Sequence, residues 1–146
     1  MANPSSTTHL PATGPVRALV ADGCALHRWL AQQMLEVLGF DAIEAVDGRD
    51  LFWKMEALRR EISVPWVVLT DVGVSVYGGL DVLEAWRDEP LPPVVVMTAF
   101  PDDAVVARVR SLGGQLLSKP FTLEQLGSTL SLARAQADEP TRAPWL

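Results

Sequence analysis

The feature that most constrains the fold of this chain is a regular alternation of short apolar runs with longer amphipathic stretches. The runs at residues 66–70 and 94–97 are almost entirely apolar, which is typical of strands buried on both faces of a sheet. Further strand candidates lie at residues 17–21, 40–45 and 115–118. Strands that alternate with helices imply a parallel sheet with right-handed crossovers. The pattern therefore predicts a doubly wound α/β domain with five strands and five helices.

The five helices are predicted from apolar residues that recur at helical spacing between the strands. Asp47 is expected to cap the second helix, and Thr122 with Gln125 forms a capping box for the last one. Gly39 is expected to end the first helix. In chain order, the apolar stripes are Leu26, Leu30, Met34 and Leu38; Leu51, Met55, Leu58 and Ile62; Leu80, Leu83 and Trp86; Val105, Val109 and Leu112; and Leu123, Leu126 and Leu130.

Composition and charge restrict what such a domain does. The chain has 146 residues, of which 49% are hydrophobic, and this suits one globular domain. Its net charge of −6 argues against nucleic-acid binding, which needs basic clusters. The polar segments 1–15 and 136–146 are predicted to be tails around a domain at 16–135, with Trp145 as an aromatic exception. Because Cys24 is the single cysteine and neither a signal peptide nor a membrane span is present, we expect a cytoplasmic protein that does not act at a membrane.

Polar residues that carry chemistry stand at the ends of four predicted strands. Asp22 follows the first strand, Asp71 the third, Thr98 the fourth and Lys119 the fifth. Ligands in parallel α/β sheets bind outside the carboxyl ends of the strands. We therefore expect two carboxylates, a hydroxyl and an ammonium to converge on one edge of the sheet.

With these motifs, the chain resembles the receiver domains of bacterial two-component response regulators. The resemblance covers roughly residues 16–135 and implies a five-stranded parallel sheet in the flavodoxin-like order 2-1-3-4-5, with five helices. It rests on Leu19-Val20-Ala21-Asp22, on Val68-Leu69-Thr70-Asp71 followed by Gly79-Leu80, on Val96-Met97-Thr98-Ala99, and on Lys119-Pro120-Phe121.

The resemblance implies that a histidine kinase or phosphotransfer protein donates a phosphoryl group to Asp71, and that the protein signals to a downstream protein by contact and is not an enzyme. Mg²⁺ is the implied cofactor, with Asp22, Asp71 and the backbone carbonyl of Gly73 as its ligands. Lys119 would add positive charge and Thr98 a hydrogen bond to the phosphoryl group. The peptide bond from Lys119 to Pro120 is expected to be cis. A homodimer through the fourth and fifth helices is left open.

The sequence departs from the family pattern at several positions. Gly23 stands where a second acid usually contacts the metal, so the affinity for Mg²⁺ is expected to be reduced. Leu116 stands where the fifth strand usually carries an aromatic residue, and the loop 73–79 lacks the usual Pro and Asp-Gly pair. Phe100 is expected to shield the site from water.

These departures motivate an alternative, in which the chain is a phosphorylation-independent pseudo-receiver that acts as an adaptor or dimerisation module. An enzyme or cofactor carrier on the same fold is disfavoured, because no glycine-rich phosphate loop follows the first strand. Trp53, Arg108 and Arg110 are candidate partner contacts, although a solvated helix face explains each arginine more simply. His27 could reach the acidic edge, but it is expected on a helix surface.

Overall fold

The computed structural model describes residues 15–61, 65–73, 78–86 and 88–137. Ile62, Trp145 and most of both predicted tails lie outside these ranges, so the domain limits 16–135 stay a prediction. Within the described residues, no helix combines the length and apolar character needed to cross a membrane.

The strands form one parallel sheet in the order β2-β1-β3-β4-β5, which confirms the predicted fold. Ala21 at the end of β1 pairs with Thr70 in β3, and Thr98 at the end of β4 pairs with Ser118 in β5. The carboxyl ends of these four strands therefore lie along one edge. The strands are β1 (Arg17–Ala21), β2 (Asp41–Ala45), β3 (Trp66–Asp71), β4 (Val94–Thr98) and β5 (Gln115–Ser118).

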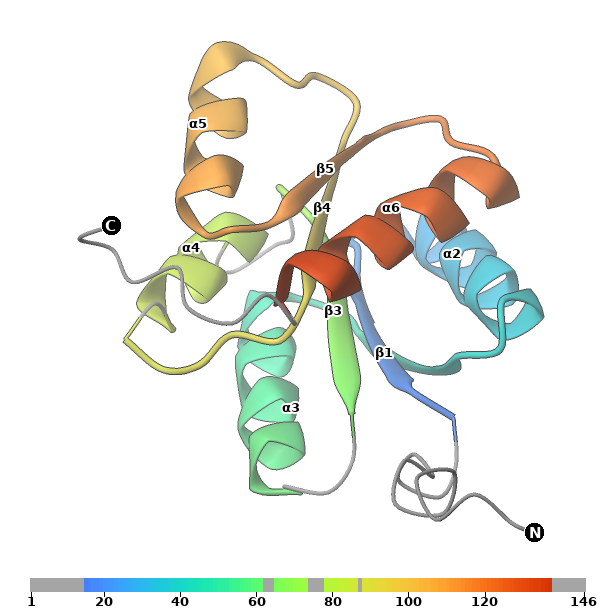
Figure 1. Ribbon diagram of the computed structural model, residues 1–146, viewed down its shortest axis with the longest axis horizontal. Helices are drawn as coiled ribbons and strands as arrows, with labels where there is room; N and C mark the ends of the chain where they lie inside the picture. Colours follow the sequence, from blue (N-terminus) through green and yellow to red (C-terminus); the bar gives the residue numbers. More distant parts are fainter. Residues whose placement is uncertain (1–14, 62–64, 74–77, 87, 138–146) are drawn as a thin grey trace, which may run out of the picture.

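Helices cover both faces of the sheet (Figure 1). On one face lie α2 (Ala25–Val37) and α6 (Leu123–Ala137), and on the other lie α3 (Gly48–Arg60), α4 (Gly79–Ala85) and α5 (Asp103–Ser111). Alternate residues of each strand point to opposite faces, and so they enter separate cores. In β1, for example, Leu19 packs toward α3, α4 and α5, whereas Val20 packs toward α2 and α6.

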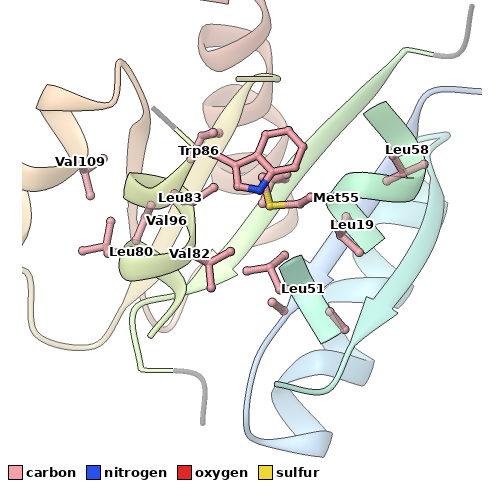
Figure 2. Packing of buried hydrophobic residues seen from close by; sticks show 14 residues of the cluster. Leu19, Leu51, Met55, Leu58, Leu80, Val82, Leu83, Trp86, Val96 and Val109 are labelled. Carbon is pink, nitrogen blue, oxygen red and sulfur yellow. The ribbon is translucent and has the colours of Figure 1, made fainter. Parts of the chain in front are cut away.

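The core under α3, α4 and α5 is built from the predicted stripes of the second and third helices (Figure 2). Leu51 and Met55 of α3 are fully buried, and Trp86 just after α4 is 2% exposed. The guanidinium of Arg59 lies 5.6 Å from the centre of the Trp86 ring, which covers the outer side of this core with a cation. Trp53 lies outside the stripe and is 61% exposed.

The predicted helix ends are confirmed. Asp47 accepts a hydrogen bond from the N–H of Asp50 at 2.7 Å. Thr122 and Gln125 exchange side chain to backbone bonds of 3.1 and 2.9 Å, as a capping box does. Gly39 has φ of 91°, a left-handed conformation that favours glycine after the last turn of α2.

The predicted core stripe of the first helix is wrong in part. Leu26 is 61% and Leu30 is 42% exposed, whereas Ala31 and Leu35 are the buried residues of α2. An α-helix turns about 100° per residue, so each step of four residues rotates the side chain by about 40°. The i+4 series therefore begins on the solvent side at Leu26 and reaches the core only toward its end.

Arg108, a candidate partner contact, binds within the chain instead. Its guanidinium pairs with Asp81 at 2.8 Å and with Glu84, both on α4. The hydrogen bonds to Glu84 and Asp81 raise the pKa of Arg108 above its ordinary value, so the group stays charged. This contact connects α5 to α4, while Arg110 is exposed.

Gly79 begins α4 in close contact with the end of β3. A Cβ atom at this position would overlap the backbone oxygen of Asp71 and the Oγ1 of Thr70. The Thr70 hydroxyl can rotate away, but the backbone oxygen cannot. The absence of a side chain at residue 79 is therefore what allows α4 to begin directly against the carboxyl end of β3.

We expect Gly79→Ala to lower the free energy of unfolding by about 1–3 kcal/mol, because the methyl group is forced against backbone. Urea denaturation followed by circular dichroism measures this loss. Gly23→Ala is the matched control, since a Cβ there meets no heavy atom within 4 Å. Equal stability of the two variants would contradict the expectation.

Candidate functional site

The two predicted carboxylates lie side by side and are oriented in the same way. Asp22 follows β1, and Asp71 is the last residue of the neighbouring strand β3. The N–H of Cys24 donates to Asp22 Oδ1 at 2.9 Å, and the N–H of Gly73 donates to Asp71 Oδ2 at 3.0 Å. A backbone N–H two residues downstream thus holds one oxygen of each carboxylate and leaves the other directed into the site.

Lys119 follows β5, two strands away from β3, and its side chain extends along the carboxyl edge of the sheet to these two carboxylates. Its Nζ lies 2.6 Å from Asp22 Oδ2 and 3.1 Å from Asp71 Oδ1. The side chain of Asp22 is only 3% exposed, whereas those of Asp71 and Lys119 are 20% and 15% exposed. The backbone N–H of Lys119 donates to the backbone oxygen of Thr98 at 2.8 Å, and the peptide bond to Pro120 is cis, as expected.

The two carboxylates keep the ammonium of Lys119 charged. Burial alone lowers the pKa of Lys119, but the hydrogen bonds to Asp22 and Asp71 and their negative charges outweigh it. The net result is a pKa above the ordinary value of a lysine. The site therefore contains a fixed positive charge at neutral pH.

Thr98 stands at the same edge and is 7% exposed. Its Oγ1 accepts the N–H of Phe100 at 3.1 Å. That bond uses a lone pair of the hydroxyl oxygen and not its proton, as a hydrogen-bond donor to a bound anion requires. The ring of Phe100 is 83% exposed and does not cover the site, so the predicted shielding role is wrong.

Two residues of α2 reach the site. Sequence reasoning gave Arg28 no part in it, and for His27 it preferred a position on the helix surface to one at the acidic edge. Arg28 donates from Nη1 to the backbone oxygen of Asp22 at 2.7 Å and from Nε to Glu44 at 3.0 Å, which holds the turn after β1 in place. His27 is exposed, as expected, yet its Nδ1 lies 3.4 Å from Lys119 Nζ. Basic residues in the first turn of the helix after Asp22 were the available signal.

An open pocket of about 380 Å³ lies next to this cluster. Asp22, His27 and Lys119 line its polar end. The rest of the lining is apolar and comes from α2, from the end of β4 and from the segment after Lys119, with Leu30, Met34, Met97 and Phe121 among its members. Charged groups therefore border a hydrophobic hollow.

The two departures that can be placed have clear surroundings. Gly23 is exposed, and a side chain there would enter open space. Leu116 is half-buried and packs against the core under α3, α4 and α5. Residues 74–77 of the loop after Asp71 lie outside the described part of the chain.

The oxygen donors at this edge fit Mg²⁺. Within the described ranges no three His, Cys, Asp or Glu side chains gather into a metal cluster, so the acidic donors of the site are Asp22 and Asp71. Mg²⁺ is commonly held by one or two carboxylates, with waters and phosphate oxygens completing its shell. Gly73 adjoins Asp71, and its carbonyl stays a predicted ligand.

Known proteins with similar sequences include transcriptional regulatory proteins. A family model described as "Response regulator receiver domain" matches residues 18–131. Transcriptional regulatory protein PdtaR of Mycobacterium tuberculosis is 33% identical over 138 residues, which cover 92% of this chain. The match covers 64% of PdtaR, so the chain spans less than two thirds of that relative.

Solved structures show the same fold. Chemotaxis protein CheY4 of Vibrio cholerae gives a TM-score of 0.70 at 24% identity, over 81% of this chain and 98% of CheY4. The matching chain of the CheX–CheY–BeF3–Mg²⁺ complex of Borrelia burgdorferi gives a TM-score of 0.70 at 18% identity. The match covers 80% of this chain and 87% of the other.

The position of Lys119 leads to a pH-dependent prediction. Its pKa is raised in the folded protein, so its stabilisation is fully present below the unfolded value of about 10.4 and is lost as pH rises through the folded pKa. We expect Lys119→Met to lower the free energy of unfolding by about 2 kcal/mol near neutral pH. The difference in the free energy of unfolding between this variant and the wild type should become smaller above about pH 10.4.

Chemical denaturation at a series of pH values measures this difference. Lys54→Met is the matched control, since Lys54 forms a partly exposed i,i+4 pair with Asp50. Such a pair contributes less than about 1 kcal/mol. If the loss of unfolding free energy in Lys119→Met stays constant into strongly alkaline solution, the stabilising role given to the charged ammonium of Lys119 is contradicted.

Proposed function

The chain belongs to the response regulator receiver domain family, and from this premise we propose that Asp71 accepts a phosphoryl group from a histidine kinase or phosphotransfer protein. The observation that carries the proposal is the ammonium of Lys119, which lies 3.1 Å from the Asp71 carboxylate at the carboxyl edge of the sheet. A cation fixed there opposes the negative charge that any phosphoryl donor brings.

The transfer itself requires few parts. An oxygen of Asp71 attacks phosphorus, the bond from phosphorus to the donor nitrogen breaks, and its electron pair leaves with the donor imidazole. The charge of Lys119 offsets that of the phosphoryl oxygens, and the Thr98 hydroxyl donates a hydrogen bond to one of them. When bound, Mg²⁺ would supply further charge neutralisation, with Asp22, Asp71 and the Gly73 carbonyl as its protein ligands.

We propose further that the chain signals by protein contact and not by catalysis, and that it does so in the cytoplasm. The surface beside the site supports a protein partner. Of the large hydrophobic side chains that are exposed in the described part of the chain, four lie on α2: Leu26, Trp29, Leu30 and Val37. We call them the α2 apolar face. Leu30 also lines the pocket next to Lys119, so this face is continuous with the site.

A homodimer through α5 and α6 is a second way in which the chain could contact a partner, but the surface of these helices supports it less than the surface of α2 supports a contact there. Arg108 of α5 already pairs with α4, and the two exposed leucines of α6, Leu123 and Leu132, lie on opposite sides of the helix and form no common face. An isolated apolar residue is normal on a protein surface, whereas a continuous face indicates an interaction site. The apolar surface therefore favours α2 as the contact with a partner.

The proposal predicts a covalent adduct on one residue. After incubation with acetyl phosphate and Mg²⁺, intact-mass measurement should show the gain of one phosphoryl group, and Asp71→Asn should abolish it. Asp102→Asn is the matched control, because Asp102 only caps α5. A folded wild-type protein that gains no mass and binds no beryllofluoride would contradict phosphorylation and support the pseudo-receiver.

The open space at Gly23 gives a second test. Gly23→Asp should restore the missing acid without a clash, since a Cβ there meets no heavy atom within 4 Å. We expect Mg²⁺ to bind roughly tenfold more tightly, because carboxylate count sets the affinity of such sites. Calorimetric titration measures the change, with Gly23→Asn as the uncharged control. Equal affinity of the two variants would show that residue 23 does not face the cation.

A further inference from the structure

Lys119 and a divalent cation compete for the same carboxylate. Asp22 is 3% exposed, and its Oδ1 accepts the N–H of Cys24, while its Oδ2 lies 2.6 Å from the ammonium. A cation on Asp22 would meet the positive charge of Lys119 across one buried carboxylate. The ammonium therefore has to move away from Asp22 when the cation binds, and it needs another hydrogen-bond acceptor.

His27 offers that acceptor. The Lys119 ammonium has three N–H donors, and three acceptors surround it: Asp22 Oδ2 at 2.6 Å, Asp71 Oδ1 at 3.1 Å and His27 Nδ1 at 3.4 Å. Lysine has no acceptor, so the contact with His27 is attractive only when Nδ1 carries no proton. In that tautomer, His27 Nδ1 accepts a hydrogen bond from the ammonium.

The pocket leaves the ammonium little choice. Asp22, His27 and Lys119 are its charged or polar side chains, and the rest of its lining is apolar. An ammonium that turned from Asp22 into this hollow without a partner would lose a hydrogen bond at considerable cost. Of the described side chains that line the pocket, His27 is the one nitrogen or oxygen acceptor that is not a carboxylate needed by the cation.

We infer that His27 is a positioning residue, which draws the Lys119 ammonium away from Asp22 by accepting a hydrogen bond from it and so frees Asp22 for a divalent cation. This inference rests on the proposed function, because it assumes that Mg²⁺ occupies the site. His27 would thereby compensate in part for the acidic side chain that the family usually has at the position of Gly23. The compensation acts on the lysine that competes with the metal, not on the metal itself.

Mg²⁺ affinity of the unphosphorylated full chain tests the inference, measured by calorimetry. His27→Ala should raise the dissociation constant roughly threefold to tenfold, the effect of one lost hydrogen bond. His27→Asn, whose amide oxygen replaces Nδ1, should stay close to wild type. Gln33→Ala, an exposed position on the same helix, is the control and should leave binding unchanged.

The decisive comparison is a double-mutant cycle with Lys119→Met. Since His27 acts through Lys119, His27→Ala should have no effect on Mg²⁺ affinity once the ammonium is absent. If Lys119→Met does not fold, the Ala and Asn variants of His27 still decide the matter in the wild-type background. An unchanged affinity in His27→Ala, or an equal loss in His27→Asn, would overturn the role of His27.

Failure of this inference is distinguishable from failure of the proposed function. Asp71 that still gains a phosphoryl group, together with Mg²⁺ binding that ignores His27, overturns only the inference. A wild-type chain that neither binds Mg²⁺ nor gains the phosphoryl group overturns both. The imidazole ¹⁵N spectrum adds an independent check, because the His27 signal of the unprotonated Nδ1 should shift on addition of Mg²⁺ only while Lys119 is present.

Discussion

One ammonium between two carboxylates is the interaction on which the site depends. Lys119 and Asp22 are 97 residues apart in sequence, and their contact joins the ends of β1 and β5 across β3 and β4. Without the ammonium of Lys119, the two carboxylates at adjacent strand ends would repel each other where little water reaches them. With it, the edge of the sheet holds two negative charges and one positive charge at short range. This balance shifts whenever a further charge arrives.

The strand ends could be predicted from the sequence because a parallel sheet places them by topology alone. Once Asp22, Asp71 and Lys119 follow buried strands, their meeting at one edge requires no knowledge of side-chain packing. Helix rotation is different. Whether Leu26 faces the core, or whether His27 reaches Lys119, depends on how α2 is rotated about its own axis. Contacts such as Arg28 with the Asp22 carbonyl are also set by that rotation, and a residue pattern does not contain it.

Two departures from the family pattern, at Gly23 and Leu116, have defined surroundings in the structure. The missing acid at Gly23 leaves Asp22 as the single carboxylate of the β1 turn, and Lys119 already uses it. Metal binding and the lysine contact are therefore opposed at both carboxylates, and most closely at Asp22 Oδ2. Leu116 packs into the core where the family usually carries an aromatic ring, so this strand has an aliphatic anchor instead of an aromatic side chain.

The α2 apolar face has a further consequence for how copies of the chain behave in solution. A helix that is apolar on both its buried and its outward side exposes a surface that water solvates poorly. At neutral pH the net charge of −6 keeps copies apart through mutual repulsion. Acidification removes that repulsion while leaving the apolar face unchanged. The colloidal solubility of the protein is therefore governed by its acids, and its lowest value lies where the net charge vanishes.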